Sequence, residues 1–282
     1  MSKMRAGIIG WPVSHSLSPV LHGYWLKHYG IGGEYVRLPA EANAFVGAVR
    51  RARDEGFVGL NVTAPHKEAA FELAESHDKA AEVSGAVNLL VFGKDKIEGR
   101  NTDHVGLHKS LEENLGTAAL SGKTVILLGA GGAARGAVLA LEEMGVSKIH
   151  ILNRHQAGAE SLSHAMALNV KAKLVPGPLA AFASIAGEAA ILINTSSAGM
   201  TGNEKLTLDL LPLPKAAVVC DIIYNPLETE LLKEAAARGH RVIDGLGMLM
   251  HQAAPSFEAF FGVKPEVTPG LRAALVEAMH GA

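Results

Sequence analysis

The chain has 282 residues, of which 48% are hydrophobic and 19% charged, and its formal net charge is −2. This composition predicts a folded protein of one or two domains and excludes intrinsic disorder and any general attraction to nucleic acid. Its single cysteine, Cys220, excludes an intrachain disulfide and a cysteine-clustered metal site. The N-terminus does not read as a signal peptide, and no apolar stretch approaches the ~18 residues of a membrane span, so we expect a soluble, cytoplasmic protein.

The first hundred residues alternate between strand and helix patterns, which is typical of a small α/β unit. Strands are predicted at 4–10, 34–38, 58–62, 87–92 and 96–99, the last two as a hairpin. Helices are predicted at 20–29, 41–55, 67–76, 79–84 and 104–115. Ser18 and Pro19 are expected to cap and open the first helix, because proline is favoured at a first helical position.

A glycine-rich turn follows the next apolar strand, in the stretch Thr124-Val-Ile-Leu-Leu-Gly129-Ala-Gly131-Gly132-Ala-Ala134-Arg135. Strand, Gly-x-Gly-x-x-Ala turn and helix together form the dinucleotide fingerprint in its proper context. Gly129 permits a tight turn, Gly131 lets the backbone approach a pyrophosphate, and Ala134 lets the helix pack against the strand. The helix N-terminus then offers free N–H groups to the phosphates.

Further strands and helices alternate up to residue 246, which favours a Rossmann-type doubly wound parallel sheet. Its strands are predicted at 124–128, 148–153, 172–175, 190–194, 218–223 and 241–244. Its helices are predicted at 135–145, near 159–168, near 179–186 and at 230–238. Two helices without a strand, 248–261 and 271–280, end the chain and are expected to pack back on the first domain. The sequence thus predicts an α/β protein with one domain at 1–104, completed by 247–282, and a Rossmann-type domain at 105–246.

The end of the second strand of this sheet indicates the cofactor. In NAD-selective folds a carboxylate stands there and binds the ribose 2′-hydroxyl. Here the strand ends in Asn153-Arg154-His155, and a guanidinium suits a 2′-phosphate instead. Arg154 therefore favours NADP.

Polar side chains follow three of the predicted N-terminal strands, where ligands bind in such sheets. They are Ser14, Ser16 and Ser18, then Asn61, Thr63 and Lys67, then Asn101 and Asp103. Hydroxyls, amides and a Lys–Asp pair suit a small polyhydroxylated acid. For His15 and His66 we favour structural hydrogen bonding over proton transfer, because Lys67 is available for that role. The histidines show no metal-binding spacing.

These residues resemble the shikimate dehydrogenase family over nearly the full length of the chain. The matching blocks are Ser14-His-Ser16-Leu-Ser18-Pro19, Asn61-Val-Thr63-Ala-Pro65-His66-Lys67, Ala86-Val-Asn88, Asn101-Thr102-Asp103, Gly129 to Ala134, Asn153-Arg154, Asn194-Thr-Ser, Asp221 to Pro226, and Gly245-Leu-Gly247-Met248-Leu249-x-x-Gln252. The resemblance implies NADPH-dependent, reversible reduction of 3-dehydroshikimate to shikimate, in aromatic amino acid and chorismate biosynthesis. It also implies that the first domain binds substrate and the second NADP.

The resemblance also implies roles for individual residues. Lys67 and Asp103 are the implied catalytic pair. The implied substrate residues are Ser16, Ser18, Asn61, Thr63, Lys67, Asn88, Asp103, Tyr224 and Gln252. The implied cofactor residues are Gly129, Ala130, Gly131, Gly132, Ala133, Asn153, Arg154, His155, Thr195, Ile222, Gly245 and Met248. No metal and no macromolecular partner is implied, and we expect a monomer or a homodimer.

One departure from the family concerns the cofactor. Many relatives carry Thr after Asn-Arg and a second basic residue nearby, where this chain has His155 and then Gln156-Ala-Gly158-Ala. The preference for NADP is therefore weaker, or His155 shares the phosphate. A quinate/shikimate dehydrogenase that uses NAD is the alternative. Two further alternatives are weighed against these residues. A non-enzymatic dinucleotide sensor on the same fold would not need Lys67 and Asp103, and a folate-type methylene dehydrogenase would lack the serine loop, residues 14–18.

Overall fold

A computed structural model of the chain describes residues 3–280, which form two compact units. Unit 1 comprises the chain up to Thr102 and the chain from Met250 onward, and unit 2 comprises Asp103–Leu249. The chain passes between the units at the start of α5 (Asp103–Leu115) and again within α10 (Leu246–Phe261). Within residues 3–280, no helix has the length and apolar character that a membrane span requires.

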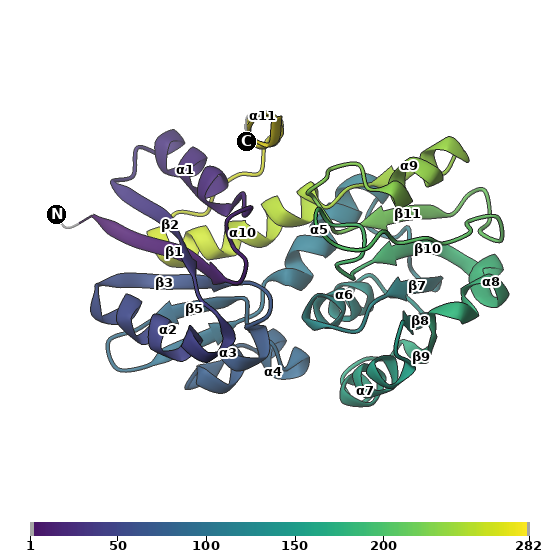
Figure 1. Ribbon diagram of the computed structural model, residues 1–282, viewed down its shortest axis with the longest axis horizontal. Coiled ribbons are helices and arrows are strands. Elements are labelled where there is room, and N and C mark those ends of the chain that lie inside the picture. The colour runs from purple at the N-terminus through teal and green to yellow at the C-terminus, as the bar shows by residue number, and fades with distance from the viewer. Residues whose placement is uncertain (1–2, 281–282) are drawn as a thin grey trace. The chain divides into compact units, whose positions relative to one another are not determined.

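The sheet of unit 1 has the strand order β2-β1-β3-β5-β6-β4 (Figure 1). Its strands are β1 (Met4–Gly10), β2 (Gly33–Pro39), β3 (Phe57–Val62), β4 (Ser76–His77), β5 (Leu89–Phe92) and β6 (Ile97–Arg100). The first three run parallel, as expected when helices connect them, and β5 and β6 form the predicted antiparallel hairpin. One edge of this sheet therefore receives the carboxyl ends of β1, β3 and β6 and the start of β5.

Helices cover both faces of this sheet. They are α1 (Ser18–His28), η1 (Ala42–Ala44), α2 (Phe45–Asp54), α3 (Lys67–Leu73), α4 (Lys79–Ser84), α10 and α11 (Pro269–His280). On one face Leu60 and Val62 pack in a buried core with Phe45 of α2 and Ala70 of α3. On the other face a Cβ added to Gly59 would meet the Phe260 ring of α10 at 2.6 Å. The C-terminal helices thus complete the core of unit 1.

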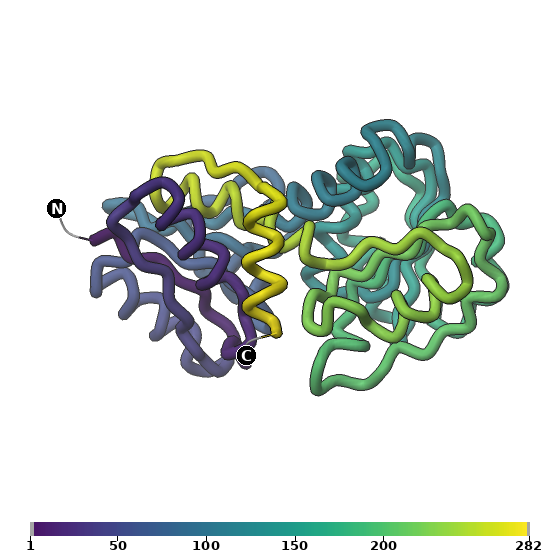
Figure 2. The backbone as a smooth tube through the Cα atoms, turned by 90° about the horizontal axis from the view of Figure 1, so that it is seen from above, coloured from purple at the N-terminus to yellow at the C-terminus, as the bar shows by residue number. Residues whose placement is uncertain are grey.

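The last helix also packs on unit 1, as predicted for the end of the chain. The indole Nε1 of Trp25 donates to the carbonyl of Glu266 at 2.9 Å, and the N–H of Glu266 donates to the Tyr29 hydroxyl at 3.0 Å. These bonds join α1 to the segment that leads into α11, and Figure 2 shows α11 beside α1.

Two local predictions for helices were wrong, and a third was correct in position but not in helix type. Leu17, not Ser18, is the N-cap of α1, and no side chain caps this helix; the N–H of Ser18 instead donates to Ser16 Oγ at 3.2 Å. The helix predicted to run to residue 76 ends at Leu73, because Ser76 and His77 form β4 against β6. The helix expected near 179–186 is a single α-turn, α8 (Phe182–Ile185), between 3₁₀ turns.

The sheet of unit 2 has the strand order β12-β11-β10-β7-β8-β9 and is parallel throughout. Its strands are β7 (Thr124–Leu128), β8 (Lys148–Asn153), β9 (Lys173–Pro178), β10 (Ala189–Asn194), β11 (Val218–Asp221) and β12 (Val242–Ile243). The order reverses between β7 and β10, which is the topological switch point of a Rossmann fold. Ligands bind at such a point, beyond the carboxyl ends of the strands.

The helices of unit 2 cover both faces of its sheet. Besides α5, α8 and the start of α10 they are α6 (Gly132–Glu143), α7 (Gln156–Met166), α9 (Glu230–Ala237) and the 3₁₀ turns η2 (Leu179–Ala181) and η3 (Ala186–Glu188). Ile126 and Leu192 of the sheet share one buried core with Phe182 of α8 and Leu231 of α9. Because crossovers are right-handed, α6 and α7 cover the opposite face. The predicted doubly wound sheet is confirmed.

His22 lies in the core of unit 1, fully buried, with its ring stacked on Tyr35 at a centroid distance of 3.9 Å. Among residues 3–280, neither ring nitrogen finds a hydrogen-bond partner. Burial disfavours the charged imidazolium and lowers the pKa of His22 from 6.5 to about 3. The folded chain therefore keeps this ring neutral, whereas the unfolded chain protonates it below about pH 6.5.

The substitution His22→Phe should make the protein less sensitive to acid. Between the two pKa values the unfolded chain binds more protons at this residue than the folded chain does, so the free energy of unfolding rises with pH across that window. This residue alone costs about 2 kcal/mol at pH ~5 relative to pH ~7.5. Phenylalanine keeps the ring stack and does not titrate. Guanidinium unfolding at both pH values should show the difference in stability shrink by about that amount, and an unchanged difference would contradict the prediction.

Candidate active site

The topology of unit 1 brings to one sheet edge those predicted substrate residues that lie next to its strands β1, β3, β5 and β6. The loops after β1 and β3 leave the sheet side by side, because the two strands are parallel neighbours. Asn88 immediately precedes β5, whose first residue, Leu89, pairs with Asn61 of β3 and Arg100 of β6. The serine loop, the Thr63–Lys67 turn, Asn88 and Asn101–Thr102 therefore share this edge.

Internal hydrogen bonds and an arginine fix the serine loop. The N–H of Ser16 donates to the carbonyl of Val13 at 3.1 Å, and Ser16 Oγ accepts from the N–H of Ser18. Arg37 of β2 donates from Nε and Nη2 to the carbonyl of Ser16, at 3.2 and 2.6 Å. Ser16 and Ser18 are buried, whereas Ser14 is exposed. Arg37 therefore supports this loop, a role that the sequence analysis missed.

The turn that carries Thr63 and Lys67 is held by its histidine. His66 is buried, its Nε2 lies 2.7 Å from the carbonyl oxygen of Ala40, and its ring stacks on Phe45. This is the structural role that the sequence favoured for His66. Lys67 follows as the half-buried first residue of α3, and its carbonyl accepts from the N–H of Val87 at 2.9 Å.

The side-chain amide of Asn61 bonds to protein groups on three sides. Its Oδ1 accepts from the Tyr35 hydroxyl at 2.8 Å. Its Nδ2 donates to the carbonyl of Asn88 at 3.2 Å and to Ser256 Oγ at 2.8 Å. Both amide protons are thereby used within unit 1. The buried amide joins β3 to β2, to the start of β5 and to α10.

A second amide network joins the hairpin to α10. Asn88 Nδ2 donates to Thr102 Oγ1 at 2.9 Å and to Gln252 Oε1 at 3.4 Å. The N–H of Thr102 donates to Asn88 Oδ1 at 2.8 Å, and Thr102 Oγ1 donates to the carbonyl of Gln252 at 2.9 Å. Gln252, far away in sequence, therefore stands beside Asn88.

Asp103 begins α5 and is 4% exposed. A Cβ placed on Gly136 of α6 would approach the Asp103 Cβ to 2.8 Å, closer than real Cβ contacts come. The missing side chain at Gly136 is therefore what lets α6 lie against the start of α5. The sequence analysis did not single out Gly136, because a glycine inside a helix pattern carries no sign of what packs against it.

The glycine turn of unit 2 has the geometry that its sequence predicts. Gly129 has φ +104°, a conformation that other residues rarely adopt, and Thr195 Oγ1 would lie 3.0 Å from a Cβ there. Gly131 is the exposed N-cap of α6, and a Cβ on it would meet nothing within 4 Å. Ala134 is fully buried. An open backbone at a helix N-terminus fits a pyrophosphate.

The ends of β10 and β11 are tied together by a buried carboxylate. Asp221 Oδ1 accepts from Asn194 Nδ2 at 3.0 Å and from the N–H of Ile223 at 3.1 Å, and Oδ2 accepts from Thr229 Oγ1 at 2.8 Å. Burial nevertheless raises the pKa of Asp221 above its usual range. Thr195 follows β10, and its Oγ1 donates to the carbonyl of Leu128 at 2.7 Å.

The other implied cofactor residues, and the implied substrate residue Tyr224, lie in three places in unit 2: after β11 and around the start of α10, at the end of β8, and on the glycine turn. The N–H of Gly245 donates to the carbonyl of Ile223 at 3.2 Å, and a Cβ on Gly245 would overlap the carbonyl of Ile222. Tyr224 lies two residues after Ile222, in the loop that follows β11, and is half-buried. Met248 is buried in α10. At the end of β8, Asn153 Nδ2 donates to the carbonyl of His155 at 3.0 Å, and Arg154 Nη2 lies 2.8 Å from Glu204 Oε2. Ala130 and Ala133 are half-buried on the glycine turn.

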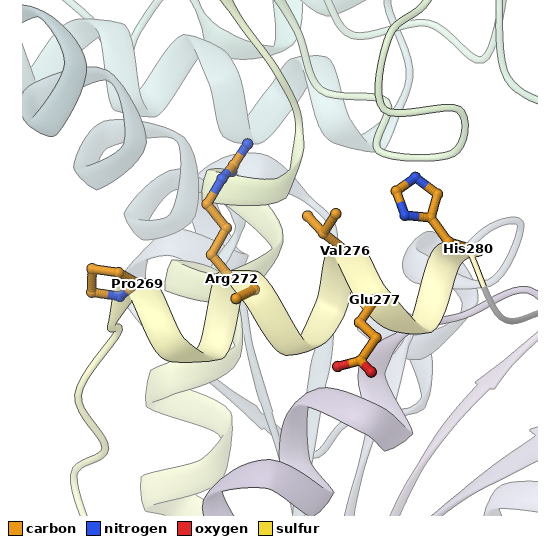
Figure 3. Close-up of a pocket in the computed structure, with 6 residues that line it drawn as sticks. Pro269, Arg272, Val276, Glu277 and His280 are labelled. Atoms are coloured by element: carbon orange, nitrogen blue, oxygen red, sulfur yellow. The ribbon is translucent and has the colours of Figure 1, made fainter.

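Two open hollows in unit 1 contain none of these residues. One, of about 540 Å³, lies along α11 and is lined by Pro269, Arg272, Ala273, Val276, Glu277 and His280. Figure 3 shows Arg272 and Glu277 pointing to opposite sides of this helix. The other, of about 290 Å³, is lined by Arg50, Arg53, Asp54, Leu73, Glu75 and Ile97. Neither brings together the hydroxyls and amides found at the strand ends. Residues 3–280 also contain no group of three or more His, Cys, Asp or Glu side chains suited to a metal ion.

A Rossmann unit with an open glycine turn, joined to an α/β unit with a lysine and buried amides at one sheet edge, defines a two-domain nucleotide-dependent dehydrogenase. Three family models match the chain. The shikimate dehydrogenase substrate binding domain matches residues 8–90, shikimate / quinate 5-dehydrogenase matches 110–222, and the shikimate 5′-dehydrogenase C-terminal domain matches 245–275. The chain belongs to the shikimate dehydrogenase family.

Individual relatives agree with this assignment. The chain is 48% identical to a shikimate dehydrogenase (NADP(+)) of Methylobacterium radiotolerans, over 98% of both chains. The Thermus thermophilus shikimate 5-dehydrogenase, solved with NADP(H) and shikimate, superposes with a TM-score of 0.84 at 31% identity, over 99% of both chains. A quinate dehydrogenase from Corynebacterium glutamicum, solved with NAD, superposes with a TM-score of 0.88 at 29% identity, over 98% of this chain and 99% of that one.

The substitution Gly136→Ala should disturb Asp103, the implied catalytic carboxylate. A methyl group at this position must push the start of α5 away, which should cost about 1–3 kcal/mol of stability and lower kcat by about 10- to 100-fold, as small misplacements of catalytic groups do. The control is Gly23→Ala in α1, where a Cβ meets nothing within 4 Å. Thermal unfolding and steady-state kinetics of both variants test this. Wild-type kcat in Gly136→Ala would contradict it.

Proposed function

We propose that the chain catalyses the NADPH-dependent, reversible reduction of 3-dehydroshikimate to shikimate in aromatic amino acid biosynthesis. The observation that carries the proposal is full-length similarity to curated NADP-dependent shikimate dehydrogenases, together with the strand-end residues of both units. The NAD-dependent quinate alternative is not favoured, because the first relatives are all NADP-dependent shikimate dehydrogenases and Arg154 stands where NAD selection needs a carboxylate. The cytoplasmic location and the monomeric or homodimeric state stay predictions.

Unit 2 is the proposed NADP-binding unit. The open N-terminus of α6 supports binding of the pyrophosphate by the backbone of Gly129–Ala133, and Arg154 supports binding of the 2′-phosphate. We propose the other cofactor contacts that the resemblance implies at Asn153, His155, Thr195, Ile222, Gly245 and Met248. When bound, NADPH supplies the hydride that reduces the ketone carbon of the substrate.

Unit 1 is the proposed substrate-binding unit. Ser16 and Ser18 are proposed to bind the substrate carboxylate, with Tyr224 from unit 2. Thr63, Asn88 and Gln252 are proposed to hold the ring oxygens, supported by the hydrogen bonds that orient Asn88 beside Gln252. Asn61 is proposed to belong to the same set, and its hydrogen bonds to Tyr35, to the carbonyl of Asn88 and to Ser256 hold its amide in place at the strand end.

Lys67 and Asp103 are the proposed catalytic residues. Reduction of the ketone leaves negative charge on its oxygen, which must take up a proton. Lys67 Nζ is proposed to stabilise that charge and to donate the proton, because an ammonium can do both. The side chain of Asp103 is proposed to orient the lysine and the substrate hydroxyl. In the oxidation direction the same lysine takes the proton back.

The activity test crosses two substrates with two cofactors. Shikimate or quinate is mixed with NADP or NAD, and the formation of reduced nicotinamide is followed by absorbance. We expect the highest kcat/KM with shikimate and NADP. Quinate carries an additional hydroxyl on the carbon that bears the carboxylate, whereas the same carbon of shikimate is planar. Two serine hydroxyls placed to bind the carboxylate of shikimate should therefore leave too little room for the additional hydroxyl of quinate. Comparable kcat/KM for quinate and NAD would favour the alternative, and no turnover in any combination would refute the proposal.

The substitution Lys67→Ala should lower kcat by roughly 10²–10⁴, the usual contribution of general acid catalysis. KM should change little, because the interaction strengthens as charge develops on the oxygen. Lys67→Met tests the same point with most of the side-chain volume kept. The matched control is Lys79→Ala, which removes an exposed lysine from the first position of α4 in the same unit. Calorimetry with shikimate separates binding from turnover. Wild-type kcat at saturation in Lys67→Ala would make Lys67 a binding residue only.

A further inference from the structure

The guanidinium of Arg154 already has an anionic partner within unit 2. Its Nη2 donates to Glu204 Oε2 at 2.8 Å, and the two side chains are 65% and 78% exposed. Glu204 lies 50 residues further along the chain, in the loop that follows β10. No sequence pattern indicates this pairing, which the fold creates by bringing that loop to the end of β8.

Backbone hydrogen bonds within the loop hold Glu204 in place. The N–H of Gly199 donates to the carbonyl of Glu204 at 2.7 Å, and Gly199 has φ +99°. Next to Glu204, the N–H of Asn203 donates to the carbonyl of Met200 at 2.9 Å and its Nδ2 donates to the carbonyl of Ser197 at 3.0 Å. The loop is therefore folded on itself, and the carboxylate is presented to Arg154 by a defined backbone.

Few cationic side chains at the end of β8 are available to bind a 2′-phosphate. Residues 153–160 read Asn-Arg-His-Gln-Ala-Gly-Ala-Glu and contain one arginine and no lysine. A 2′-phosphate carries about two negative charges and binds best to the forked donors of a guanidinium. Glu204 takes up one of those donors and brings a negative charge of its own. A ribose with a free 2′-hydroxyl meets no such competition.

We propose that Glu204 is a specificity-determining residue, whose carboxylate competes with the 2′-phosphate of NADP(H) for Arg154 and narrows the preference for NADP over NAD. This inference rests on the proposed role of Arg154. Because the ion pair of Arg154 and Glu204 is solvent-exposed, removing the Glu204 carboxylate should change the Kd for NADP+ by a factor of only about two to five. Glu204 thus tunes the preference, and Arg154 sets its direction.

The test measures binding without turnover. Isothermal titration calorimetry gives Kd for NADP+ and NAD+ with wild type, Glu204→Gln, Arg154→Gln and the double variant. We expect Glu204→Gln to bind NADP+ about two- to fivefold more tightly at low ionic strength, with its Kd for NAD+ unchanged. In the Arg154→Gln background the same substitution should lose most of this effect. Adenosine 2′,5′-bisphosphate and 5′-AMP serve as smaller probes and should show the same contrast.

The matched control is Glu230→Gln, which removes an exposed carboxylate of unit 2 that is paired with Lys233 at 3.2 Å. It corrects for the change in net charge and should alter neither Kd. An unchanged Kd for NADP+ in Glu204→Gln, an equal gain for both cofactors, or the same gain without Arg154 overturns the inference. If Arg154→Gln leaves NADP+ binding intact, the role of Arg154 fails and the inference fails with it. If Arg154→Gln weakens NADP+ binding and Glu204→Gln changes nothing, only the inference fails.

Discussion

The buried amide of Asn61 is the constraint on which the polar edge of unit 1 depends. Its three hydrogen bonds reach Tyr35 on β2, the carbonyl of Asn88 and Ser256 on α10. A buried polar group that loses its partner costs about 1–3 kcal/mol, so each of these bonds limits where its element can lie. Because Gln252 stands one turn before Ser256 on α10, the bond that anchors the helix also sets the position of Gln252.

Close backbone approaches play the corresponding part in unit 2. Gly129 turns at positive φ beside Thr195, so the ends of β7 and β10 meet at the topological switch point. Asp221 then joins the ends of β10 and β11 through its hydrogen bond with Asn194, and two further bonds, from Ile223 and Thr229, hold the carboxylate, although burial raises its pKa. In both units, strand ends are therefore brought together by a glycine without a side chain or by a buried polar side chain whose polar atoms are hydrogen-bonded. The residues proposed for chemistry follow directly after these strand ends.

Local predictions were correct where consecutive residues determine the structure, and wrong where contacts with other residues decide it. Strand positions were predicted well, because apolar runs bounded by glycine and polar turns are local features. The predicted Ser18 cap was wrong because Ser16 accepts the N–H of Ser18 and the helix begins one residue earlier. The helix after Lys67 ended early because Ser76 and His77 pair with β6, a contact that helix propensity cannot anticipate.

The sequence by itself determined the glycine turn, the arginine at the end of β8, the alternation of strands and helices, and the motifs that identify the family. These are written in consecutive residues and depend on backbone conformation and local chemistry. Only the tertiary structure decided that Arg37 supports the serine loop and that Asn61 donates both amide protons to protein acceptors. It also decided that Gly136 leaves room for Asp103 and that Glu204 pairs with Arg154. Each of these joins residues far apart in the chain, and their proximity follows from strand order and helix packing, which no local pattern encodes.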